Sequence, residues 1–494
     1  MSLEQLFAPF DPPFTSLPCH LRYWVEHTPD ELACAFLTDG ENDDIRMTFE
    51  DLDRRASAIA ATLQQRGLTG KQAMLLFPPG PEFVESFFGC MYAGVVAVPA
   101  YPPRRNRNKL RIESIADDSQ SVAALTVSSI LDRSRDSIDA AAENGDKLEW
   151  IATDTIDSAA ASEYAQHTND PNDIAFLQYT SGSTGSPKGV VLSHGNIIDN
   201  CKKITCSFET GRDVTGLSWL PTYHDMGLVG GLLNPMFIGR PTYLMSPMLF
   251  LQKPIRWLKA ISRYKVTISG GPNFAYDLCT KKIDEKDLDE IDLSTWGLAF
   301  NGAEPVRRRT LEKFAEKFAQ CGFRPEAFYP CYGMAETTLI VTGGVRAEKP
   351  VVRCFDGSAL DEGKVIAAAP DGDRGRFVVG SGQILPNEDV LVVDPDTLTK
   401  VPHDRVGEIW ISSASVGQGY WNKPDVTAET FHGKLADSDD QTSYLRSGDL
   451  GFFHRGELFV TGRLKDLIIV RGVNRYPQDI EMTVERADRR LRNG

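Results

Sequence analysis

A segment rich in glycine and hydroxyl side chains carries the strongest chemical signal in the sequence. It follows a predicted strand, Asp173 to Gln178, and runs Tyr179-Thr180-Ser181-Gly182-Ser183-Thr184-Gly185-Ser186-Pro187-Lys188-Gly189. Its glycines let the backbone approach a ligand closely, and its N–H and hydroxyl groups can cradle phosphate oxygens. Lys188 adds a positive charge, but the proline before it and the glycine after it exclude a Walker A loop. We therefore predict a phosphate-binding loop of another type rather than a flexible linker.

Two carboxylates stand in segments that could serve the same ligand. Glu336 lies in Phe328-Tyr329-Pro330-Cys331-Tyr332-Gly333-Met334-Ala335-Glu336-Thr337, and a glutamate suits a hard cation that also binds phosphate. Asp449 lies in Leu445-Arg446-Ser447-Gly448-Asp449-Leu450-Gly451, and a carboxylate can accept hydrogen bonds from two hydroxyls. The alternatives are a helix N-terminal charge for Glu336 and an ordinary turn around Asp449.

A histidine and an amide complete the set of candidate groups. His224 lies in Leu220-Pro221-Thr222-Tyr223-His224-Asp225-Met226-Gly227, and an imidazole can orient a carboxylate and stabilise developing charge. A single histidine is more often a core residue, so this role depends on its motif. The last segment, Asn301-Gly302-Ala303-Glu304-Pro305, can also be a turn before a helix that begins at Arg307.

Together these segments resemble the signatures of the adenylate-forming superfamily, which holds acyl-CoA synthetases, luciferases, nonribosomal adenylation domains and fatty acyl-AMP ligases. The resemblance extends from about Thr48 to Glu481 and includes Thr461-Gly462-Arg463-Leu464-Lys465-Asp466. It implies catalytic roles for Lys188, His224 and Glu336, a magnesium ion on Glu336, and a hinge at Lys465. The residues that it implies in ATP or AMP binding are Thr180, Ser181, Gly182, Ser183, Thr184, Gly185, Lys188, Asn301, Gly302, Ala303, Tyr332, Gly333, Met334, Ala335, Asp449 and Arg463. The residues expected near the acyl tail are Trp219, Met226, Gly271 and Phe274.

The reaction implied by this resemblance is attack of a fatty carboxylate on the α-phosphate of ATP, with pyrophosphate as the leaving group. Little covalent chemistry falls to the protein, so positioning and charge neutralisation would dominate. By resemblance, Tyr332 stacks on adenine, Asp449 binds ribose, and Arg463 contacts ribose or phosphate. We expect the glycine-rich loop, His224 and Glu336 to meet at one nucleotide.

Three features favour the fatty acyl-AMP ligase branch over the acyl-CoA synthetases. Two are the branch's versions of known segments, Val98-Pro99-Ala100-Tyr101-Pro102-Pro103-Arg104, and Tyr223 to Gly227 with Ser269 to Tyr276. The third is an insertion at about residues 345–379, where we predict short strands at Val351–Phe355 and Lys364–Ile366. In that branch the insertion packs on the large domain and is thought to hinder the CoA-dependent half-reaction. The alternative is a surface hairpin.

Helical and strand patterns alternate along the first part of the chain and indicate parallel sheets covered by helices. The predicted helices are Phe49–Arg66, Glu82–Ala93 and Arg307–Gln320, and the predicted strands are Gln72–Phe77, Val95–Val98, Lys265–Ser269 and Ala327–Tyr329. We predict an α/β fold with a large domain over residues 1–465, comprising two βα-layered subdomains with parallel-rich sheets and a smaller β-rich subdomain at about 380–462. Residues 466–494 would be the hinge and the start of a small C-terminal domain.

The amino-acid composition limits the classes of binding partner that we expect. Lys and Arg number 53 and Asp and Glu 68, and the net charge of −15 disfavours nucleic acid and anionic membranes as partners. We predict no signal peptide and no membrane span. The nine cysteines form no C-x-x-C pair, which favours reduced thiols in the cytoplasm.

The resemblance implies a fatty acid as substrate and, as acceptor, an acyl carrier protein or a carrier domain of a polyketide or nonribosomal peptide synthase. The basic run from Arg104 to Arg111 could guide such a carrier or be a solvated loop.

Only 29 residues follow Lys465, and none of them is a lysine, whereas superfamily members continue for about a hundred residues with a catalytic lysine. We expect a chain that binds ATP or acyl adenylate but forms product slowly. Two alternatives stay open: a fatty acyl-CoA synthetase, and a non-catalytic module that binds adenylates.

Overall fold

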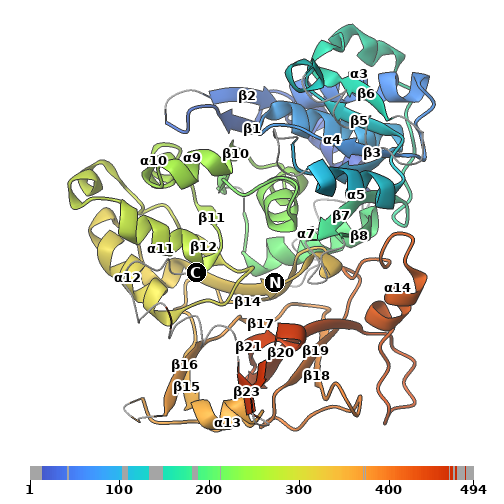
Figure 1. Cartoon of the computed structure of the whole chain (residues 1–494). Coiled ribbons are helices and arrows are strands. Elements are labelled where there is room, and N and C mark those ends of the chain that lie inside the picture. Colours follow the sequence, from blue (N-terminus) through green and yellow to red (C-terminus); the bar gives the residue numbers. More distant parts are fainter. Residues whose placement is uncertain are drawn as a thin grey trace. The chain divides into compact units, whose positions relative to one another are not determined.

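The computed structural model describes residues 14–41, 44–102, 109–132, 148–180, 187–211, 213–370, 372, 374–466, 468–470, 473–475 and 484 (Figure 1). The chain divides into two compact units. The first comprises Met1–Cys206, Thr210–Ala260 and Gly417–Pro424, and the second comprises Ser207–Glu209, Ile261–Val416 and Asp425–Gly494. The predicted division into domains at residue 465 stays a prediction.

A six-stranded, mostly parallel sheet forms the centre of the first unit. Its strands are β6 (Glu149–Ala152), β5 (Ala123–Thr126), β3 (Gln72–Leu75), β4 (Val96–Pro99), β7 (Ile174–Thr180) and β8 (Lys188–Ser193), in that spatial order. All neighbouring pairs are parallel except β7 and β8. Strands β4 and β5 are fully buried and β3 is buried after Gln72, which matches the apolar runs expected of a sheet covered on both faces.

The helices of this sheet begin and end where their sequences indicate. The α-helices are α3 (Phe49–Gln65), α4 (Pro81–Ala93) and α5 (Lys109–Ser119), and the 3₁₀ turns are η2 (Thr153–Thr155) and η3 (Ser158–Glu163). Thr48 and Asp51 form a capping box at the start of α3. Helix α3 packs on α4, where a Cβ at Gly89 would lie 2.7 Å from Cγ2 of Ile59. These helices therefore fix the sheet that holds β7 and β8.

The first unit also contains a second group of strands, in the order β9 (Gly216–Ser218), β10 (Thr242–Met245), β1 (Leu32–Leu37) and β2 (Asp44–Thr48). Strands β9, β10 and β1 are parallel, and β2 is antiparallel to β1. The remaining helices are α2 (Leu17–His27), α7 (His194–Ser207), the π-helix η4 (Met226–Leu233), α8 (Asn234–Phe237), α9 (Pro247–Gln252) and α10 (Ile255–Arg263).

Two buried histidines of the first unit make its stability sensitive to acid. Burial lowers the pKa of His20 to about 3 and that of His194 to about 4. Below pH 6.5 the unfolded chain therefore binds protons that the folded chain excludes, and stability falls as the pH falls. Each histidine should lower the free energy of unfolding by about 1 kcal/mol between pH 7.5 and 5.5. Urea denaturation at the two pH values measures this, and His194→Gln should reduce the loss, whereas His432→Gln, at an exposed position, should not.

The second unit contains mixed and antiparallel sheets. One group has the order β17 (Gln383–Ile384), β14 (Ile340–Gly343), β13 (Phe328–Gly333), β12 (Leu298–Asn301) and β11 (Ile268–Gly270), of which β11, β12 and β13 are parallel. A four-stranded antiparallel sheet has the order β18 (Asp389–Val393), β19 (Gly407–Ser412), β20 (Leu445–His454) and β21 (Glu457–Arg463). This sheet is the β-rich part of the predicted α/β fold, which the structure confirms.

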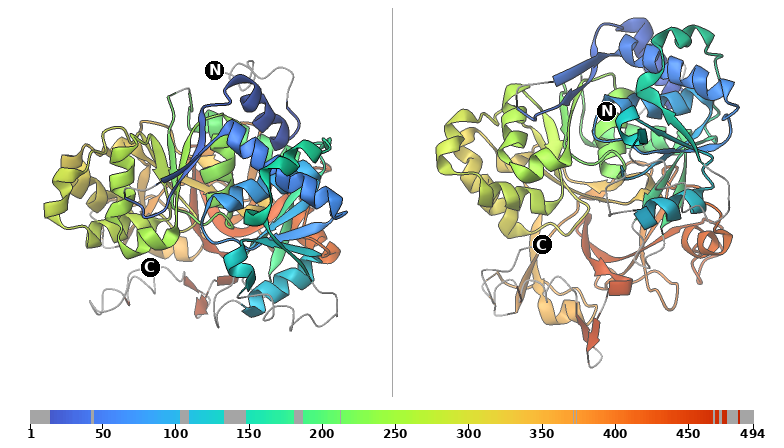
Figure 2. Two further views of the ribbon diagram at one scale, coloured as in Figure 1. Left: turned by 90° about the horizontal axis from the view of Figure 1, so that it is seen from above. Right: turned by 45° about the horizontal axis from the view of Figure 1, so that its top comes forward.

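Helices α11 (Asn273–Lys282) and α12 (Arg308–Phe318) pack together and lie side by side in both figures (Figures 1 and 2). The side chain of Asn273 joins their starts, because its Nδ2 donates to Thr310 and its Oδ1 accepts from the Arg307 N–H. The other helical segments are η5 (Glu285–Glu290), η6 (Ala319–Cys321), η7 (Pro325–Ala327), η8 (Ala335–Thr337), α13 (Gly357–Asp361), α14 (Pro424–Phe431) and η9 (Leu464–Asp466). Strands β22 (Ile468–Val470) and β23 (Val473–Arg475) form the last described hairpin.

The predicted insertion contains one strand where we expected it and one where we did not. Strand β15 (Val352–Asp356) pairs with β16 (Gly375–Val379), so the prediction of a strand at Lys364–Ile366 was wrong. Asp356 accepts a hydrogen bond from the Ala359 N–H at 2.9 Å and caps helix α13 directly after β15. Beyond this helix, Lys364 makes an isolated bridge with Arg405 instead of a strand ladder. Phe355 packs on Phe452 and Phe459 of the four-stranded sheet, which anchors the insertion within the second unit.

All nine cysteines are free thiols. Within the described residues, no helix combines the length and the apolar character needed to cross a membrane. The basic run from Arg104 to Arg111 falls largely outside the described residues.

Candidate active site

The glycine-rich loop connects the two antiparallel strands β7 and β8. Thr180 and Lys188 are paired at the ends of these strands, so the segment between them closes a hairpin. Its residues Ser181, Gly182, Ser183, Thr184 and Gly185 lie outside the described residues, and their contacts with phosphate stay predictions. A Cβ at Gly189 would lie 2.8 Å from the ring of Tyr179 on the opposite strand. The glycine after Lys188 is therefore required by close approach across the hairpin.

A short segment from far along the chain supports Lys188. Residues 417–421 pair with the free edge of β8, through the Val191 N–H to the Gly419 carbonyl at 2.9 Å and the Trp421 N–H to the Gly189 carbonyl at 2.8 Å. Nζ of Lys188 lies 4.9 Å from the ring centre of Tyr420, at cation–π distance. Residues 417–421 thus cover a sheet edge and contact the lysine at the end of the loop.

His224 lies just before the π-helix η4, in an exposed position. Nδ1 of His224 is 2.5 Å from Oδ1 of Asp225, and its side chain is 56% exposed. Asp225 also accepts from the Met226 N–H at 2.7 Å, which caps η4. π-Helices are rare and often mark functional sites. The histidine is therefore held by its neighbour and open to a ligand.

The loop strand and the histidine segment are tied to each other. Gln178 of β7 is buried, and its Nε2 donates to the carbonyl of Tyr223 at 2.9 Å. The ring of Tyr223 lies 4.3 Å, centre to centre, from that of Tyr101. The structure thus brings together both branch-specific segments of the first unit and the strand that leads into the phosphate loop.

The Asp225 carboxylate raises the pKa of His224, against the opposing effect of burial. The protonated imidazole should therefore persist above pH 6.5 and be lost as the pH rises through the raised value. We expect Asp225→Asn, whose amide oxygen can still cap η4, to lower that pKa. Carbethoxylation of His224 by diethyl pyrocarbonate, which attacks the neutral ring, measures this as a function of pH, with His224→Gln as background. Equal pH profiles for the variant and the parent chain would contradict the assignment.

In the second unit, three predicted nucleotide residues form one cluster. The Tyr332 hydroxyl donates to Oδ2 of Asp449 at 2.8 Å, and Nε of Arg463 donates to Oδ1 at 3.1 Å. Burial raises the pKa of Asp449, while Arg463 and the Tyr332 hydrogen bond oppose that shift. Each carboxylate oxygen accepts one of these hydrogen bonds and can accept a second, which is the pattern needed for two ribose hydroxyls.

The turn that holds Glu336 is tightly constrained. Glu336 is buried in η8, and Gly333 just before it would place a Cβ 1.6 Å from the carbonyl oxygen of Leu339. Thr338 has a φ of 67° and a ψ of −57°, an unfavourable conformation for a β-branched residue. Its hydroxyl donates to the Ser415 carbonyl at 2.7 Å. Residues whose strained backbone conformation is enforced by the surrounding structure are concentrated at ligand-binding sites.

Asn301, at the end of β12, is an unusual buried amide. Its side chain is fully buried, and neither Oδ1 nor Nδ2 has a hydrogen-bond partner among the residues that the structure describes. Gly302 is buried, and Ala303 has a φ of 65° in an exposed turn. Buried polar groups normally have partners, so this amide indicates that a ligand or water completes the site.

The four residues predicted near the acyl tail are divided between the two units. Trp219 is buried, with its ring centre 4.0 Å from that of Phe250, so it is part of an aromatic core. Met226 begins the π-helix. In the second unit, Gly271 follows β11, and the Phe274 N–H donates to Glu304 at 2.5 Å. Glu304 therefore satisfies the start of α11, a role that we did not predict. The acyl assignments stay predictions.

For two further predictions, the structure gives the position of the residue but does not test its role. Lys465 is exposed in η9, and its role as a hinge stays a prediction. No group of three His, Cys, Asp or Glu side chains able to hold a metal occurs among the described residues. A single buried carboxylate at Glu336 fits magnesium that takes its other ligands from phosphate and water, rather than an all-protein cage.

Sequence reasoning missed the supporting groups because they act over long distances in the chain. Gln178 is one example, since its partner lies 45 residues away. Another is Glu408, whose buried carboxylate accepts from the Gly448 N–H, 40 residues away in the chain. The one available signal was a glutamate between a glycine and an apolar run.

Comparison with known proteins places these features in a family. The family model described as AMP-binding enzyme matches residues 21–421. The chain is 42% identical to a medium-chain-fatty-acid–[acyl-carrier-protein] ligase of Moorena producens, over 98% of this chain and 82% of the relative. It is 34% identical to a long-chain-fatty-acid–AMP ligase of Mycolicibacterium smegmatis, over 98% and 79%. A Legionella pneumophila fatty acyl-adenylate ligase, solved in complex with acyl adenylate and pyrophosphate, superposes with a TM-score of 0.87 at 44% identity, covering 96% of this chain and 81% of that one.

Proposed function

Because the chain belongs to the AMP-binding enzyme family, we propose that it activates a fatty acid with ATP, forming fatty acyl-AMP and pyrophosphate. The enzyme is a fatty acyl-AMP ligase whose product is passed to an acyl carrier protein or a carrier domain. The proposal that the chain binds a nucleotide is supported mainly by the buried Asp449, which accepts hydrogen bonds from Tyr332 and Arg463. The acyl part is supported by the relatives, which are named as fatty-acid ligases.

The nucleoside would be held by groups of the second unit. Asp449 accepts hydrogen bonds from the ribose hydroxyls, with Arg463 and Tyr332 keeping the carboxylate in place. The amide of Asn301, which lacks partners of its own, matches the paired donor and acceptor of adenine N6 and N7. Tyr332, whose hydroxyl is already bound, would offer its ring face to the base.

The reacting groups would be held by Lys188, the glycine-rich loop and His224. Lys188 and the amides of the glycine-rich loop would hold the β- and γ-phosphates, because Lys188 stands at the end of the hairpin that closes this loop. His224, held by Asp225 and raised in pKa, would orient the fatty carboxylate and stabilise negative charge that develops on the α-phosphate. The carboxylate oxygen attacks phosphorus, the bond to the bridging oxygen breaks, and pyrophosphate leaves with the electron pair.

Magnesium would bind Glu336 together with phosphate oxygens and would supply charge neutralisation there. The protein's own part is to keep this carboxylate buried on the constrained turn after Gly333. The nine free thiols support a cytoplasmic location.

Mass spectrometry of the products tests the function. With ATP, Mg²⁺ and an equimolar series of fatty acids, we expect acyl-AMP and pyrophosphate. Addition of a phosphopantetheinylated carrier protein should give acyl carrier, whereas addition of CoA should leave acyl-AMP as the main product. Rapid formation of acyl-CoA would instead identify a CoA synthetase, and absence of any adenylate, with ATP still bound, would identify a non-catalytic binding module.

A matched pair of variants connects this test to the structure. Lys188→Met should weaken ATP binding roughly tenfold or more, since a hydrogen bond to a charged group contributes about 1.5–3 kcal/mol. Lys434→Met, which removes an exposed lysine that bonds Gln441, should not affect product formation.

A further inference from the structure

Strand β20 departs from regular pairing at the point where it carries Asp449. Glu408 of β19 pairs with Leu450, and Trp410 pairs with Arg446. Between these pairs β19 has one residue, Ile409, whereas β20 has three, Ser447, Gly448 and Asp449. The extra residues form a β-bulge, in which backbone groups lose their regular ladder partners. Gly448 has a φ of 71°, which lets the bulge turn sharply.

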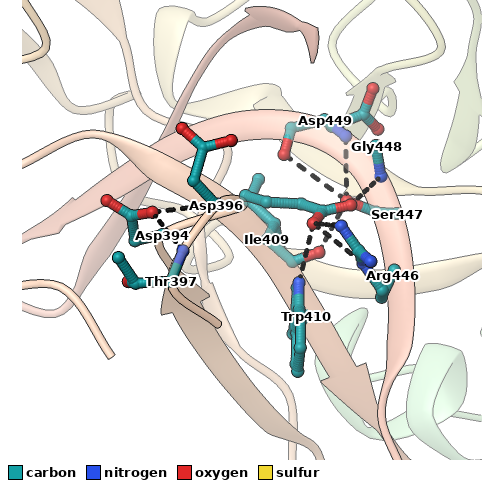
Figure 3. Close-up of polar contacts among 10 residues, drawn as sticks. Asp394, Asp396, Thr397, Ile409, Trp410, Arg446, Ser447, Gly448 and Asp449 are labelled. Atoms are coloured by element: carbon teal, nitrogen blue, oxygen red, sulfur yellow. Dashed lines mark hydrogen bonds and ion pairs between the residues drawn. The ribbon is translucent and has the colours of Figure 1, made fainter. Parts of the chain in front are cut away.

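One buried carboxylate supplies the missing partners of this bulge. Glu408 is 2% exposed. Its Oε1 accepts from the Gly448 N–H at 3.1 Å, and its Oε2 accepts from Nε and Nη2 of Arg446 at 3.1 and 2.9 Å. Oε2 also accepts from the Trp410 indole N–H at 2.9 Å. Figure 3 shows Arg446, Gly448 and Trp410 close to one another, beside Asp449.

The serine of the bulge completes the arrangement on the other side. The Ser447 hydroxyl donates to the carbonyl of Ile409 at 2.6 Å and accepts from the Asp449 N–H at 3.0 Å (Figure 3). The backbone N–H groups of both Gly448 and Asp449 are therefore held by side chains rather than by strand pairing. Since the Asp449 side chain projects from this backbone, the position of its carboxylate depends on these two side-chain contacts.

We propose that Glu408 is a positioning residue for nucleotide binding, which sets the orientation of the Asp449 carboxylate toward the ribose by fixing the Gly448 N–H and Arg446. The inference deepens the proposed function and rests on Asp449 binding ribose. All four contacts of the Glu408 carboxylate converge on the bulge that carries Asp449, or on the residues at its start.

A second buried glutamate of the second unit provides a control for an effect on stability alone. Glu457 is also buried, and its Oε1 accepts from a backbone N–H, that of Gly382, at 2.9 Å. It pairs with His454 at the end of strands β20 and β21, away from the bulge between β19 and β20. A Glu457→Gln substitution therefore changes a buried, hydrogen-bonded carboxylate of this sheet without changing the contacts of Asp449.

The test is a binding cycle with ATP, 2′-deoxyATP and 3′-deoxyATP, measured by calorimetry on the full chain with Mg²⁺ and without fatty acid. In the parent chain each deoxy analogue should bind roughly tenfold more weakly than ATP, because one hydrogen bond to Asp449 is lost. In Glu408→Gln, an amide NH₂ must face either Arg446 and Trp410 or the Gly448 N–H. ATP should then bind roughly tenfold more weakly, and the preference for ATP over the deoxy analogues should fall toward one. Glu457→Gln should keep the full preference.

If Glu408→Gln weakens ATP and both analogues by the same factor, or leaves all affinities unchanged, the positioning role is overturned. Should this variant not fold, Ser447→Ala, which frees the Asp449 N–H, should reduce the ATP preference in the same way, and an unchanged preference overturns the proposal. Failure of the proposed function is seen separately in the parent chain, as absent ATP binding or equal affinities for ATP and both analogues.

Discussion

Asp449→Ala should lose ATP affinity by about a hundredfold or more. The substitution removes the acceptor of two ribose hydroxyls, and each hydrogen bond to a charged group contributes about 1.5–3 kcal/mol. It also leaves the buried Tyr332 hydroxyl without its acceptor and Arg463 without its ion pair. Calorimetric titration with ATP measures the loss, and thermal unfolding separates it from loss of fold.

Asp389→Ala is the matched control for this prediction. Asp389 accepts from the Tyr444 hydroxyl at 2.6 Å, so the second unit contains another tyrosine–aspartate pair in the same four-stranded sheet. Its removal should leave ATP affinity within about twofold, since it touches no predicted nucleotide residue. Similar losses in both variants would show that Asp449 acts on the fold rather than on ribose.

Gly333→Ala should reduce the rate of adenylate formation by roughly a hundredfold, because a displacement of about 1 Å at catalytic groups can lower a rate by that factor. A Cβ here would lie 1.6 Å from the carbonyl oxygen of Leu339 and 2.7 Å from its carbonyl carbon. Both atoms belong to the backbone, so the clash is relieved only by moving the turn between Tyr332 and Glu336. Overpacking of this kind also costs about 1–3 kcal/mol of stability. Pyrophosphate release and urea denaturation measure the two effects.

Gly344→Ala provides the comparison. Gly344 lies just past β14, the partner strand of β13, and its Cβ would have neighbours no closer than 3.7 Å. Activity and stability of this variant should stay close to those of the parent chain. Normal activity in Gly333→Ala would mean that the turn can shift without consequence, and the role of Glu336 would have to be reconsidered.

The parts of the fold that local chemistry determines were predictable from the sequence. The start of α3 at Thr48 is one case, because its capping box lies within four consecutive residues. The strand that leads into the phosphate loop is another, since its apolar run ends at residues rich in glycine and hydroxyl groups. The insertion was predicted only in part, because the isolated bridge made by Lys364 depends on Arg405, which lies outside the insertion.

The candidate site was predictable as a list of motifs but not as a set of contacts. That Tyr332, Asp449 and Arg463 form one cluster depends on the pairing of β20 with β21 and on the approach of β13, which belongs to another sheet, and no local pattern specifies either. The role of Trp219 near the acyl tail stays a prediction, because its ring packs on Phe250 and Trp257, where indole area contributes to stability with or without a ligand. Adjacent aromatic residues in sequence do not reveal which ring faces a substrate.

The segment from Gly417 to Pro424 has a consequence for how the protein is made. It belongs to the first unit, although about 150 residues of the second unit precede it in the chain. While the ribosome synthesises those residues, the outer edge of β8 has no partner from this segment, and exposed strand edges promote association between chains. The first unit therefore cannot complete its structure in simple order of synthesis. Nascent chains must keep that edge protected until Tyr420 has emerged.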